Sequence, residues 1–380
     1  MFDELIKFIR GQYKTNDAIP LHAPVLNNFD REGVLEAIDS GFVSSVGPHV
    51  PKFEEELAKA TGAVKAVAVV NGTAALHMAM IVSGVQPGDA VITQALTFVA
   101  TANAISYLGA KPIFLDSDPE TLGLSHIALA NFLSHSAIKK DGKAYLKSSG
   151  QKIAACVAMH VFGHPVRILE IMDVCNEWGI PLIEDAAEAL GSEINDKKLG
   201  SIAPIGALSF NGNKIITTGG GGALLFRDEA LAAKAKHLST TAKRAHTWEF
   251  YHDEVGYNYR MPNLNAALGC AQLKRLPEFL AVKSKLANAY EQFFATQNDV
   301  KFISARPGTK PNWWLNAVLL RDRVMRDQWL KEANAQGIML RPVWELMSDL
   351  PMYANCSRDS LEVARALTNR LVNLPSGVIS

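Results

Sequence analysis

Short apolar, β-rich runs alternate with longer helical patterns through the first half of this 380-residue chain. The apolar runs cover residues 66–70, 90–93, 112–116, 153–160 and 181–185, and helical patterns cover 28–40, 52–61, 74–83 and 98–108. Strands connected through helices pair in parallel, because the helix carries the chain back along the sheet. The alternation therefore predicts an α/β domain whose central sheet is mainly parallel.

A different pattern begins near Tyr257. Residues 262–295 read as one long helix, and a strand, a helix and a strand follow at 315–320, 325–336 and 339–343. This order predicts a smaller α+β domain at the C-terminus.

The length agrees with such a division, because 380 residues suggest two or three units. We expect an N-terminal arm (1–24), a large domain (25–250) and a small C-terminal domain (251–380). The lysine-rich stretch 139–152 is expected to be a solvated surface loop.

Charge balance narrows the possible functions. The chain has 38 Lys and Arg against 38 Asp and Glu, so no overall field attracts a polyanion. A dedicated nucleic-acid binder is therefore disfavoured. The hydrophobic content of 48% with 20% charged residues is typical of an ordered globular protein.

Cysteine spacing and apolar run lengths exclude further classes. The four cysteines form no CxxC pair and no zinc-like spacing. No apolar run reaches the ~20 residues of a membrane helix, and Asp3 and Glu4 are unlike a signal peptide. We expect a cytoplasmic protein that holds no metal and binds no membrane.

The first candidate site is the turn Asn71-Gly72-Thr73-Ala74, between a predicted strand and a predicted helix. Ligands bind at the carboxyl ends of parallel strands, and a helix N-terminus offers free N–H groups to a phosphate. Taken alone, the turn is better explained as a helix cap.

The second candidate site is the pair Asp185 and Glu188, at the end of a predicted strand. Such carboxylates could bind a metal, act as acid and base, or hold a cationic ring. A solvated helix start explains them equally simply. A metal is disfavoured because no further ligands with suitable spacing lie nearby.

The third candidate site is Lys214, which follows Ser209 and precedes an apolar pair and a run of four glycines. Burial lowers the pKa of a lysine and makes its neutral amine available for imine formation. By itself a surface lysine before a glycine-rich hairpin is the better explanation.

The three candidates together fit pyridoxal phosphate (PLP). This cofactor needs a lysine that forms an imine, a carboxylate opposite its pyridine nitrogen and a helix N-terminus for its phosphate. The chain presents the phosphate turn, Asp185 and Lys214 in that order. Phe98 follows the second strand and could stack on the ring, although taken alone it is better explained as a core aromatic residue.

The chain also resembles a known family. The strings 71–76, 94–103, 184–188, 209–222 and 256–261 resemble those of the DegT/DnrJ/EryC1/StrS family of PLP-dependent nucleotide-sugar aminotransferases. The resemblance extends from about residue 20 to the end. It implies PLP-dependent transferase fold type I, an aspartate aminotransferase-like large domain plus a small domain.

The resemblance implies roles for matching residues. Lys214 would bind the cofactor and move protons, Asp185 would hold the pyridinium nitrogen, and Glu188 would lie near the phenolic oxygen. The resemblance also implies that the cofactor phosphate is bound by Gly72, Thr73, Ala74 and Ser209. Phe98 would stack on the cofactor ring, and His160 would lie near the cofactor. Asn258 is expected to reach the cofactor phosphate of a second subunit, which implies a homodimer with shared active sites.

Within the family, the strings 43–47, 159–165 and 211–220 look most like the branch that aminates UDP-4-keto-6-deoxy-N-acetylglucosamine. The resemblance implies glutamate as amino donor and 2-oxoglutarate and UDP-4-amino-4,6-dideoxy-N-acetylglucosamine as products. Residues expected to bind the sugar nucleotide are Arg260, Trp314, Asn316, Arg341 and Trp344. For the two tryptophans, core packing is an equal alternative.

Other functions stay open at this stage. The same chemistry could act at C3 or on a dTDP-keto-sugar. The chain could also be a catalytically silent PLP-binding regulator, although the presence of Lys214 and Asp185 argues against it. Sugar dehydratases of the family replace the lysine with histidine, so Lys214 favours transamination. Because the chain has no net charge, we expect Arg260 or Arg341 to hold the diphosphate locally.

Overall fold

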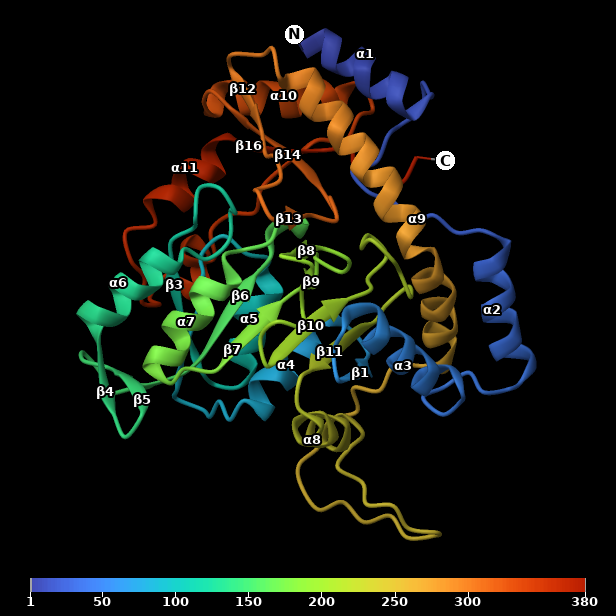
Figure 1. Ribbon diagram of the computed structural model, residues 1–380, viewed down its shortest axis with the longest axis vertical. Helices are drawn as coiled ribbons and strands as arrows, with labels where there is room; N and C mark the ends of the chain where they lie inside the picture. The colour runs from blue at the N-terminus through green and yellow to red at the C-terminus, as the bar shows by residue number, and fades with distance from the viewer. Residues whose placement is uncertain (1, 380) are drawn as a thin grey trace.

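A nine-stranded sheet lies at the centre of the computed structural model, which describes residues 2–379 (Figure 1). The main path of this sheet has the order β1-β11-β10-β7-β6-β2-β3. These strands are β1 (Lys65–Val69), β2 (Ala90–Gln94), β3 (Lys111–Leu115), β6 (Lys152–Met159), β7 (Leu182–Asp185), β10 (Ile205–Ser209) and β11 (Gly222–Phe226).

Pairing within this sheet is mixed. The neighbours from β10 through β7, β6 and β2 to β3 are parallel, as the alternation predicts. Strand β11 runs antiparallel to both β1 and β10, and a loop of residues 210–221, which carries Lys214, connects it to β10.

Helices cover both faces of the sheet, and a separate hydrophobic core lies between each group of helices and the sheet. One face holds α4 (Gly72–Val82), α5 (Val99–Tyr107) and α8 (Glu229–Ser239). The other holds α3 (His49–Thr61), α6 (His126–Ser136), α7 (Ile168–Trp178) and the first half of α9 (Asn263–Phe294). Helix α2 (Asn28–Asp39) lies along α9 (Figure 1).

The C-terminal domain is an antiparallel sheet with helices, which agrees with the predicted α+β pattern. Its strand order is β12-β14-β16-β15. The elements are β12 (Val300–Phe302), β14 (Asn316–Leu320), α10 (Arg323–Ala335), β15 (Arg341–Pro342), α11 (Glu362–Arg370) and β16 (Leu371–Leu374). The short 3₁₀ turns are η1 (Val161–Gly163), η2 (Met347–Asp349) and η3 (Pro351–Tyr353).

The N-terminal helix α1 (Phe2–Tyr13) packs on this C-terminal domain. Its Leu5 and Ile9 are buried in one cluster with Tyr290 and Trp329. Helix α9 belongs to both domains: Cys270 and Phe279 lie in the core below the large sheet, whereas Tyr290 lies in the C-terminal core. Helix α9 therefore connects the two cores, and the domain boundary near residue 250 stays a prediction.

The lysine-rich stretch 139–152 is not the expected loop. Strands β4 (Ala137–Lys140) and β5 (Lys143–Leu146) form an antiparallel hairpin that extends the central sheet through β6. Asp141 and Gly142 make the turn with φ values of 51° and 72°, as a tight hairpin requires. The lysines mark the solvent-facing side of an edge strand.

A second small sheet bridges the domains, with β13 (Thr309–Lys310), β8 (Glu193–Ile194) and β9 (Lys197–Lys198) in that order. All four cysteines are free. Within residues 2–379, no helix is both long and apolar enough to cross a membrane.

Candidate active site

A cavity of about 350 Å³ opens at the carboxyl ends of β7 and β10. The start of α4 forms the floor, and Trp314 and Trp344 from the C-terminal domain form an aromatic wall. The lining residues that matter here are Asn71, Gly72, Thr73, Phe98, Thr101, Met159, Asp185, Glu188, Ser209, Asn213, Lys214, Trp314 and Trp344. Nine of the fifteen predicted site residues are in this set.

The N-terminus of α4 forms a cradle at the floor of the cavity. Asn71 caps the helix, because its Oδ1 accepts the N–H of Ala74 at 2.8 Å. A Cβ at Gly72 would lie 2.8 Å from the Cβ of Ser209, so only glycine allows this close approach. The N–H groups of the first turn and the Thr73 and Ser209 hydroxyls can therefore surround a phosphate.

Asp185 ends β7 inside the cavity wall and is buried. The Thr101 hydroxyl donates to its Oδ2 at 2.7 Å, and the N–H of Ala187 donates to its Oδ1 at 3.2 Å. Burial raises the pKa of the Asp185 carboxyl, and these hydrogen bonds lower it. A cationic group in the cavity would stabilise this carboxylate, as the proposed pyridinium partner requires.

Glu188 and Lys214 form the second charged pair of the cavity. Lys214 Nζ lies 3.2 Å from Glu188 Oε1 and 4.1 Å from the ring centroid of Trp314. The N–H of Phe162 donates to the other carboxylate oxygen at 2.9 Å. Burial raises the pKa of Glu188 to about 7, against the lowering effect of the lysine charge. The Glu188 carboxyl can therefore gain or lose a proton near neutral pH.

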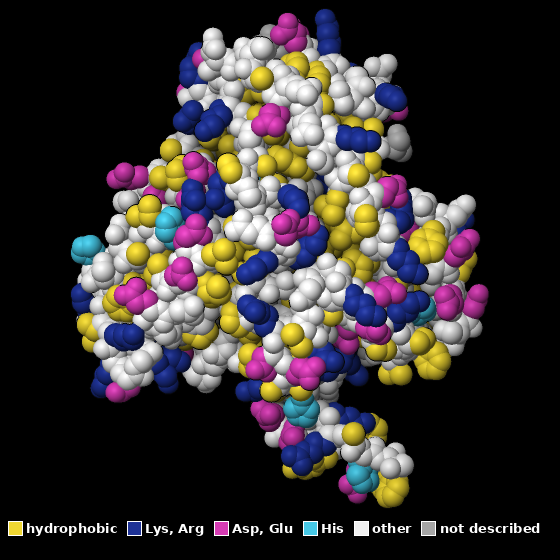
Figure 2. Space-filling view, in the orientation of Figure 1, with side chains coloured by type: hydrophobic (Ala, Val, Ile, Leu, Met, Phe, Trp, Pro, Cys, Tyr) yellow, Lys and Arg dark blue, Asp and Glu magenta, His cyan; other side chains and the backbone are white. Residues whose placement is uncertain are grey.

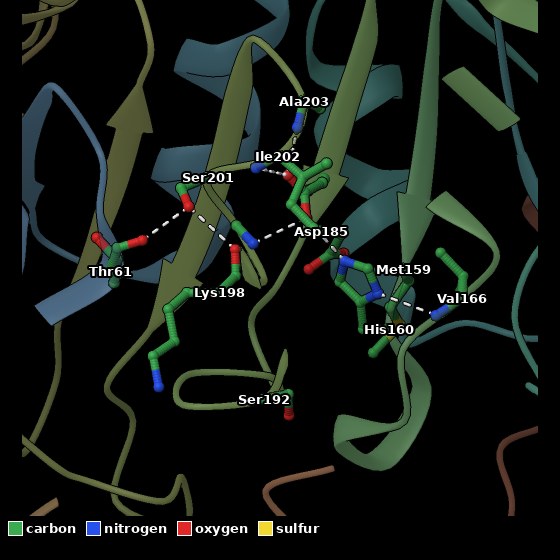
Figure 3. Close-up of polar contacts among 12 residues, drawn as sticks. Thr61, Met159, His160, Val166, Asp185, Ser192, Lys198, Ser201, Ile202 and Ala203 are labelled. Atoms are coloured by element: carbon green, nitrogen blue, oxygen red, sulfur yellow. Dashed lines mark hydrogen bonds and ion pairs between the residues drawn. The ribbon is translucent and has the colours of Figure 1, made fainter. Parts of the chain in front are cut away.

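His160 is not among the residues that line the cavity, and Figure 3 shows it among the polar contacts near the end of β7. Its Nε2 meets Glu184 Oε2 at 3.1 Å and its Nδ1 accepts the N–H of Val166 at 3.2 Å. The accepting Nδ1 places the ring proton on Nε2, which donates to the glutamate. His160 thus holds the turn that carries Phe162.

Glu184 is the centre of this buried network. Its two oxygens also accept the N–H groups of Gly200, Ile202 and Ala203 at 2.8, 2.7 and 2.6 Å. These bonds tie the loop before β10 to the end of β7 (Figure 3). Four donors satisfy the carboxylate fully, so Glu184 is a structural residue.

The aromatic wall is fixed by an asparagine that the sequence does not single out. The Asn312 amide donates to the carbonyls of Glu188 and Leu190 at 2.8 and 2.9 Å, and its Oδ1 accepts the N–H of Trp314 at 2.8 Å. Trp313 takes a left-handed φ of 56° at this point. Strain of this kind is held by surrounding bonds and is common at functional sites.

Six predicted residues do not line this cavity. His160 is described above, and Ala74 contributes only its backbone within α4. Asn316 is buried, with its Nδ2 bonded to Ser376 Oγ at 3.0 Å. Asn258 is exposed and accepts from Arg260 Nε at 3.0 Å, and Arg341 lines a neighbouring cavity.

Several lining residues were missed because their signals are weak. Thr101 lies three residues after Phe98 in α5, so helical spacing brings both to one face, but nothing marks it as a partner of Asp185. Met159 and Asn213 are adjacent in sequence to His160 and Lys214, and only the fold turns them into the cavity.

The residues present fit pyridoxal phosphate. The helix cradle suits its phosphate, Asp185 suits its ring nitrogen and the amine of Lys214 suits its carbonyl carbon. Phe98 lines the cavity and is 48% exposed, and its ring centroid lies 6.1 Å from that of Trp344.

Comparison with known proteins gives the same answer. A family model described as the DegT/DnrJ/EryC1/StrS aminotransferase family matches residues 24–378. GDP-perosamine synthase of Caulobacter vibrioides is 36% identical over 361 residues, which cover 94% of this chain and 93% of the relative. The dTDP-4-dehydro-2,3,6-trideoxy-D-glucose 4-aminotransferase of Saccharopolyspora spinosa is 30% identical over 373 residues, covering 94% and 92%.

The fold is also found among solved structures. The aminotransferase TlmJ from Streptoalloteichus hindustanus superposes with a TM-score of 0.85 at 29% sequence identity. The superposition covers 94% of this chain and 93% of that one.

Proposed function

We propose that this chain, which belongs to the DegT/DnrJ/EryC1/StrS aminotransferase family, aminates the C4 ketone of UDP-4-keto-6-deoxy-N-acetylglucosamine. Family membership makes the chain a PLP-dependent sugar aminotransferase of fold type I, as the sequence predicts. The finer proposal names the sugar, its nucleotide, the ring position and glutamate as the amino donor.

The observation that carries the activity is the pairing of Lys214 with Glu188 beside the buried Asp185. When bound, pyridoxal phosphate accepts an amino group, holds it and passes it on, because its protonated ring withdraws electrons from the reacting carbon. A silent PLP-binding regulator needs no such pair of charged groups, and a dehydratase of this family needs no lysine.

The residues of the chain then have separate tasks. Glu188 holds Lys214 Nζ at 3.2 Å and so positions the amine that would bind the carbonyl carbon of the cofactor. With the cofactor bound, Lys214 Nζ would take a proton from the donor's α-carbon and would later return one to the sugar carbon. Asp185 keeps a proton on the ring nitrogen, and Trp314 covers Nζ and keeps water away.

Support for the UDP sugar comes from sequence strings. The segments 43–47, 159–165 and 211–220 resemble those of enzymes that act on UDP-4-keto-6-deoxy-N-acetylglucosamine. The products would be UDP-4-amino-4,6-dideoxy-N-acetylglucosamine and, from glutamate, 2-oxoglutarate. Arg341, at the mouth of the neighbouring cavity, is a candidate for the diphosphate.

A second candidate is the same amination on a GDP- or dTDP-linked sugar. The names of the two relatives favour it, because one is a GDP-perosamine synthase and the other a dTDP-sugar 4-aminotransferase. The second name also specifies position 4, which supports C4 over C3.

A homodimer with shared sites is part of the proposal. Residues 243–256 form an arm that projects from the body (Figure 1), and apolar side chains gather on it and over α2 (Figure 2). Trp248 and Phe250 are 76% and 81% exposed. Asn258 and Arg260 lie at the base of the arm, outside their own cavity, from where they could complete the cavity of a second copy.

The proposed function is tested by supplying the purified, PLP-loaded enzyme with glutamate and a panel of UDP-, GDP- and dTDP-4-keto-6-deoxy sugars. Mass spectrometry should detect the amino sugar with UDP-4-keto-6-deoxy-N-acetylglucosamine at the highest kcat/KM. A higher kcat/KM with a GDP or dTDP sugar replaces the first candidate with the second. Failure to aminate any member overturns both.

Dimerisation is tested with mixed inactive variants. Lys214→Ala and Asn258→Ala homodimers should both be nearly inactive. A mixture that exchanges subunits should regain activity, because one of its two sites then combines an intact Lys214 with an intact Asn258. A monomer in sedimentation experiments would contradict the shared site.

A further inference from the structure

A second cavity of about 330 Å³ adjoins the cofactor cavity on the side of the C-terminal domain. The two share Asn213, Trp314 and Trp344 as lining residues. Phe162 also lines the second cavity, and its ring centroid lies 5.2 Å from that of Trp344 and 6.5 Å from that of Trp314. Aromatic side chains therefore lie between the two cavities, and Lys214 lines the first of them.

His22 lines this second cavity without a hydrogen bond. Both of its ring nitrogens are buried, and neither finds a partner among residues 2–379. The segment that carries it is held in place by a bridge between Ile19 and Ile338 and by the N–H of Ser376, which donates to the carbonyl of Leu21 at 2.7 Å. The imidazole is thus fixed beside a cavity with its hydrogen-bonding capacity unused.

Asn373 supplies another unused polar atom. Its side chain is buried, and its Oδ1 has no partner within the described part of the chain. Asn373 lies directly opposite Arg341 in the β15–β16 ladder, so both side chains stand on one face of the sheet and line the cavity. Buried polar atoms are normally paired, so three such atoms at one cavity indicate a ligand.

The chemistry of these groups specifies the ligand class. Burial lowers the pKa of His22 well below its usual value, and the nearby charges of Lys283 and Lys214 add to this effect. The ring is therefore neutral, with one donor and one acceptor. Asn373 Oδ1 is a further acceptor. Such a set suits a hydroxyl or an amide, which both donate and accept, and does not suit a phosphate, which only accepts.

The indole rings give the same indication. Trp314 and Trp344 add apolar aromatic surface to the lining of the second cavity, and sugar rings combine apolar C–H faces with polar substituents. A carbohydrate satisfies both the aromatic side chains and the polar atoms at His22 and Asn373.

We propose that the second cavity binds the hydroxyl or acetamido substituents of the sugar, and that His22 and Asn373 determine which sugar is accepted. This inference rests on the proposed function, because it assigns a subsite to the nucleotide sugar of that reaction. It concerns the ring substituents next to the aminated carbon, whereas Arg341, elsewhere on the lining of this cavity, is the candidate for the diphosphate.

The test measures the affinity of the PLP-loaded enzyme for UDP-N-acetylglucosamine and for UDP by calorimetry, with GDP-mannose and GDP as a second pair. Wild type should bind a sugar nucleotide more tightly than the matching nucleotide. His22→Phe and Asn373→Leu should each reduce this advantage by about tenfold or more, with nucleotide affinity unchanged. Met339→Leu, on the same cavity wall, is the matched apolar control.

The conservative variants His22→Gln and Asn373→Gln provide a second test, should either apolar variant fold poorly. Each retains a donor and an acceptor, so part of the sugar advantage should return. The inference is overturned if His22→Phe and Asn373→Leu still bind the sugar nucleotide more tightly than the nucleotide by the wild-type ratio. It is also overturned if wild type shows no such preference with either UDP-N-acetylglucosamine or GDP-mannose.

The two half-reactions separate this inference from the proposed function. The change in cofactor absorbance on adding glutamate should stay within about twofold of wild type in every variant, while kcat/KM for the keto-sugar falls. If the glutamate step alone slows, the cavity serves the amino donor and the inference is wrong. If wild type aminates no nucleotide sugar, the proposed function fails, although sugar binding can still be measured.

Discussion

Strand β7 ends in two carboxylates, Glu184 and Asp185, and they have opposite roles. Glu184 is satisfied by one histidine and three backbone N–H groups and connects parts of the fold. Asp185 accepts two hydrogen bonds and borders the cavity. Neighbouring strand residues point to opposite faces, so one strand end carries a structural face and a chemical face, only one residue apart.

This difference teaches that burial alone does not identify a catalytic carboxylate. Both side chains are buried. What distinguishes them is the number of donors, because a carboxylate whose lone pairs are all taken has none left for a ligand. Substitutions on the two faces should therefore fail in different ways.

The largest effect is expected on the chemical face. Lys214→Ala removes the amine and should lower turnover by ~10⁴-fold or more, while the free energy of unfolding changes little. Single-turnover kinetics and urea denaturation measure the two quantities. Retention of more than a hundredth of wild-type turnover would contradict the assigned role.

Asp185→Asn should lower turnover by about 10²- to 10³-fold, because a neutral amide cannot keep the ring nitrogen protonated. The free energy of unfolding of the cofactor-free protein should stay constant or rise, because burial disfavours the charged form that is removed. A large loss of stability together with a normal kcat would show that Asp185, and not only Glu184, is a structural residue.

Glu184→Gln tests the structural face. Its amide would turn a donor toward N–H groups that need an acceptor, so the free energy of unfolding should fall by about 3 kcal/mol. Turnover per folded molecule should stay within a few-fold of wild type. His160→Phe, which removes one of the four donors, should show the same pattern more weakly, by about 1–2 kcal/mol. A kinetic defect without a stability defect in either variant would place it in the catalytic machinery.

The smallest effect concerns pH. Glu188 has a pKa of about 7 in the folded chain, against 4.5 as the reference value. The folded state therefore binds more protons between these values, and its stability falls as pH rises through this window. For the cofactor-free protein we expect a decline of about 2 kcal/mol between pH 5 and 8. Glu188→Gln should flatten the curve, and an unchanged slope would assign the decline to other groups.

The sequence predicts the chemical face better than the structural one. The turn at Gly72, the strand ending at Asp185 and Lys214 are local patterns, and a cofactor with three requirements connects them. Period-2 alternation places Glu184 on the other face, but its donors come from residues 200–203 and from His160, which the fold brings together over long range. Spacing along the chain does not reveal such convergence.

The same limit applies to the walls and edges of the site. Asn312, His22 and Asn373 act at places where separate segments meet, and nothing in their local sequence indicates a cavity. The hairpin at 137–146 was missed for another reason: its lysines face solvent on an edge strand, and their charge obscures the strand pattern.

The continuity of α9 sets how the molecule can move. The helix runs unbroken for 32 residues through both cores, with Pro277 inside it. Its Lys283 holds the carbonyl of Trp314 at 3.3 Å, so the aromatic wall is fastened to this helix. A hinge motion between the domains would have to bend this helix, which is about 48 Å long. Helices commonly kink at proline. We therefore expect product release to depend on flexing near Pro277, which makes turnover sensitive to the stiffness of one helix.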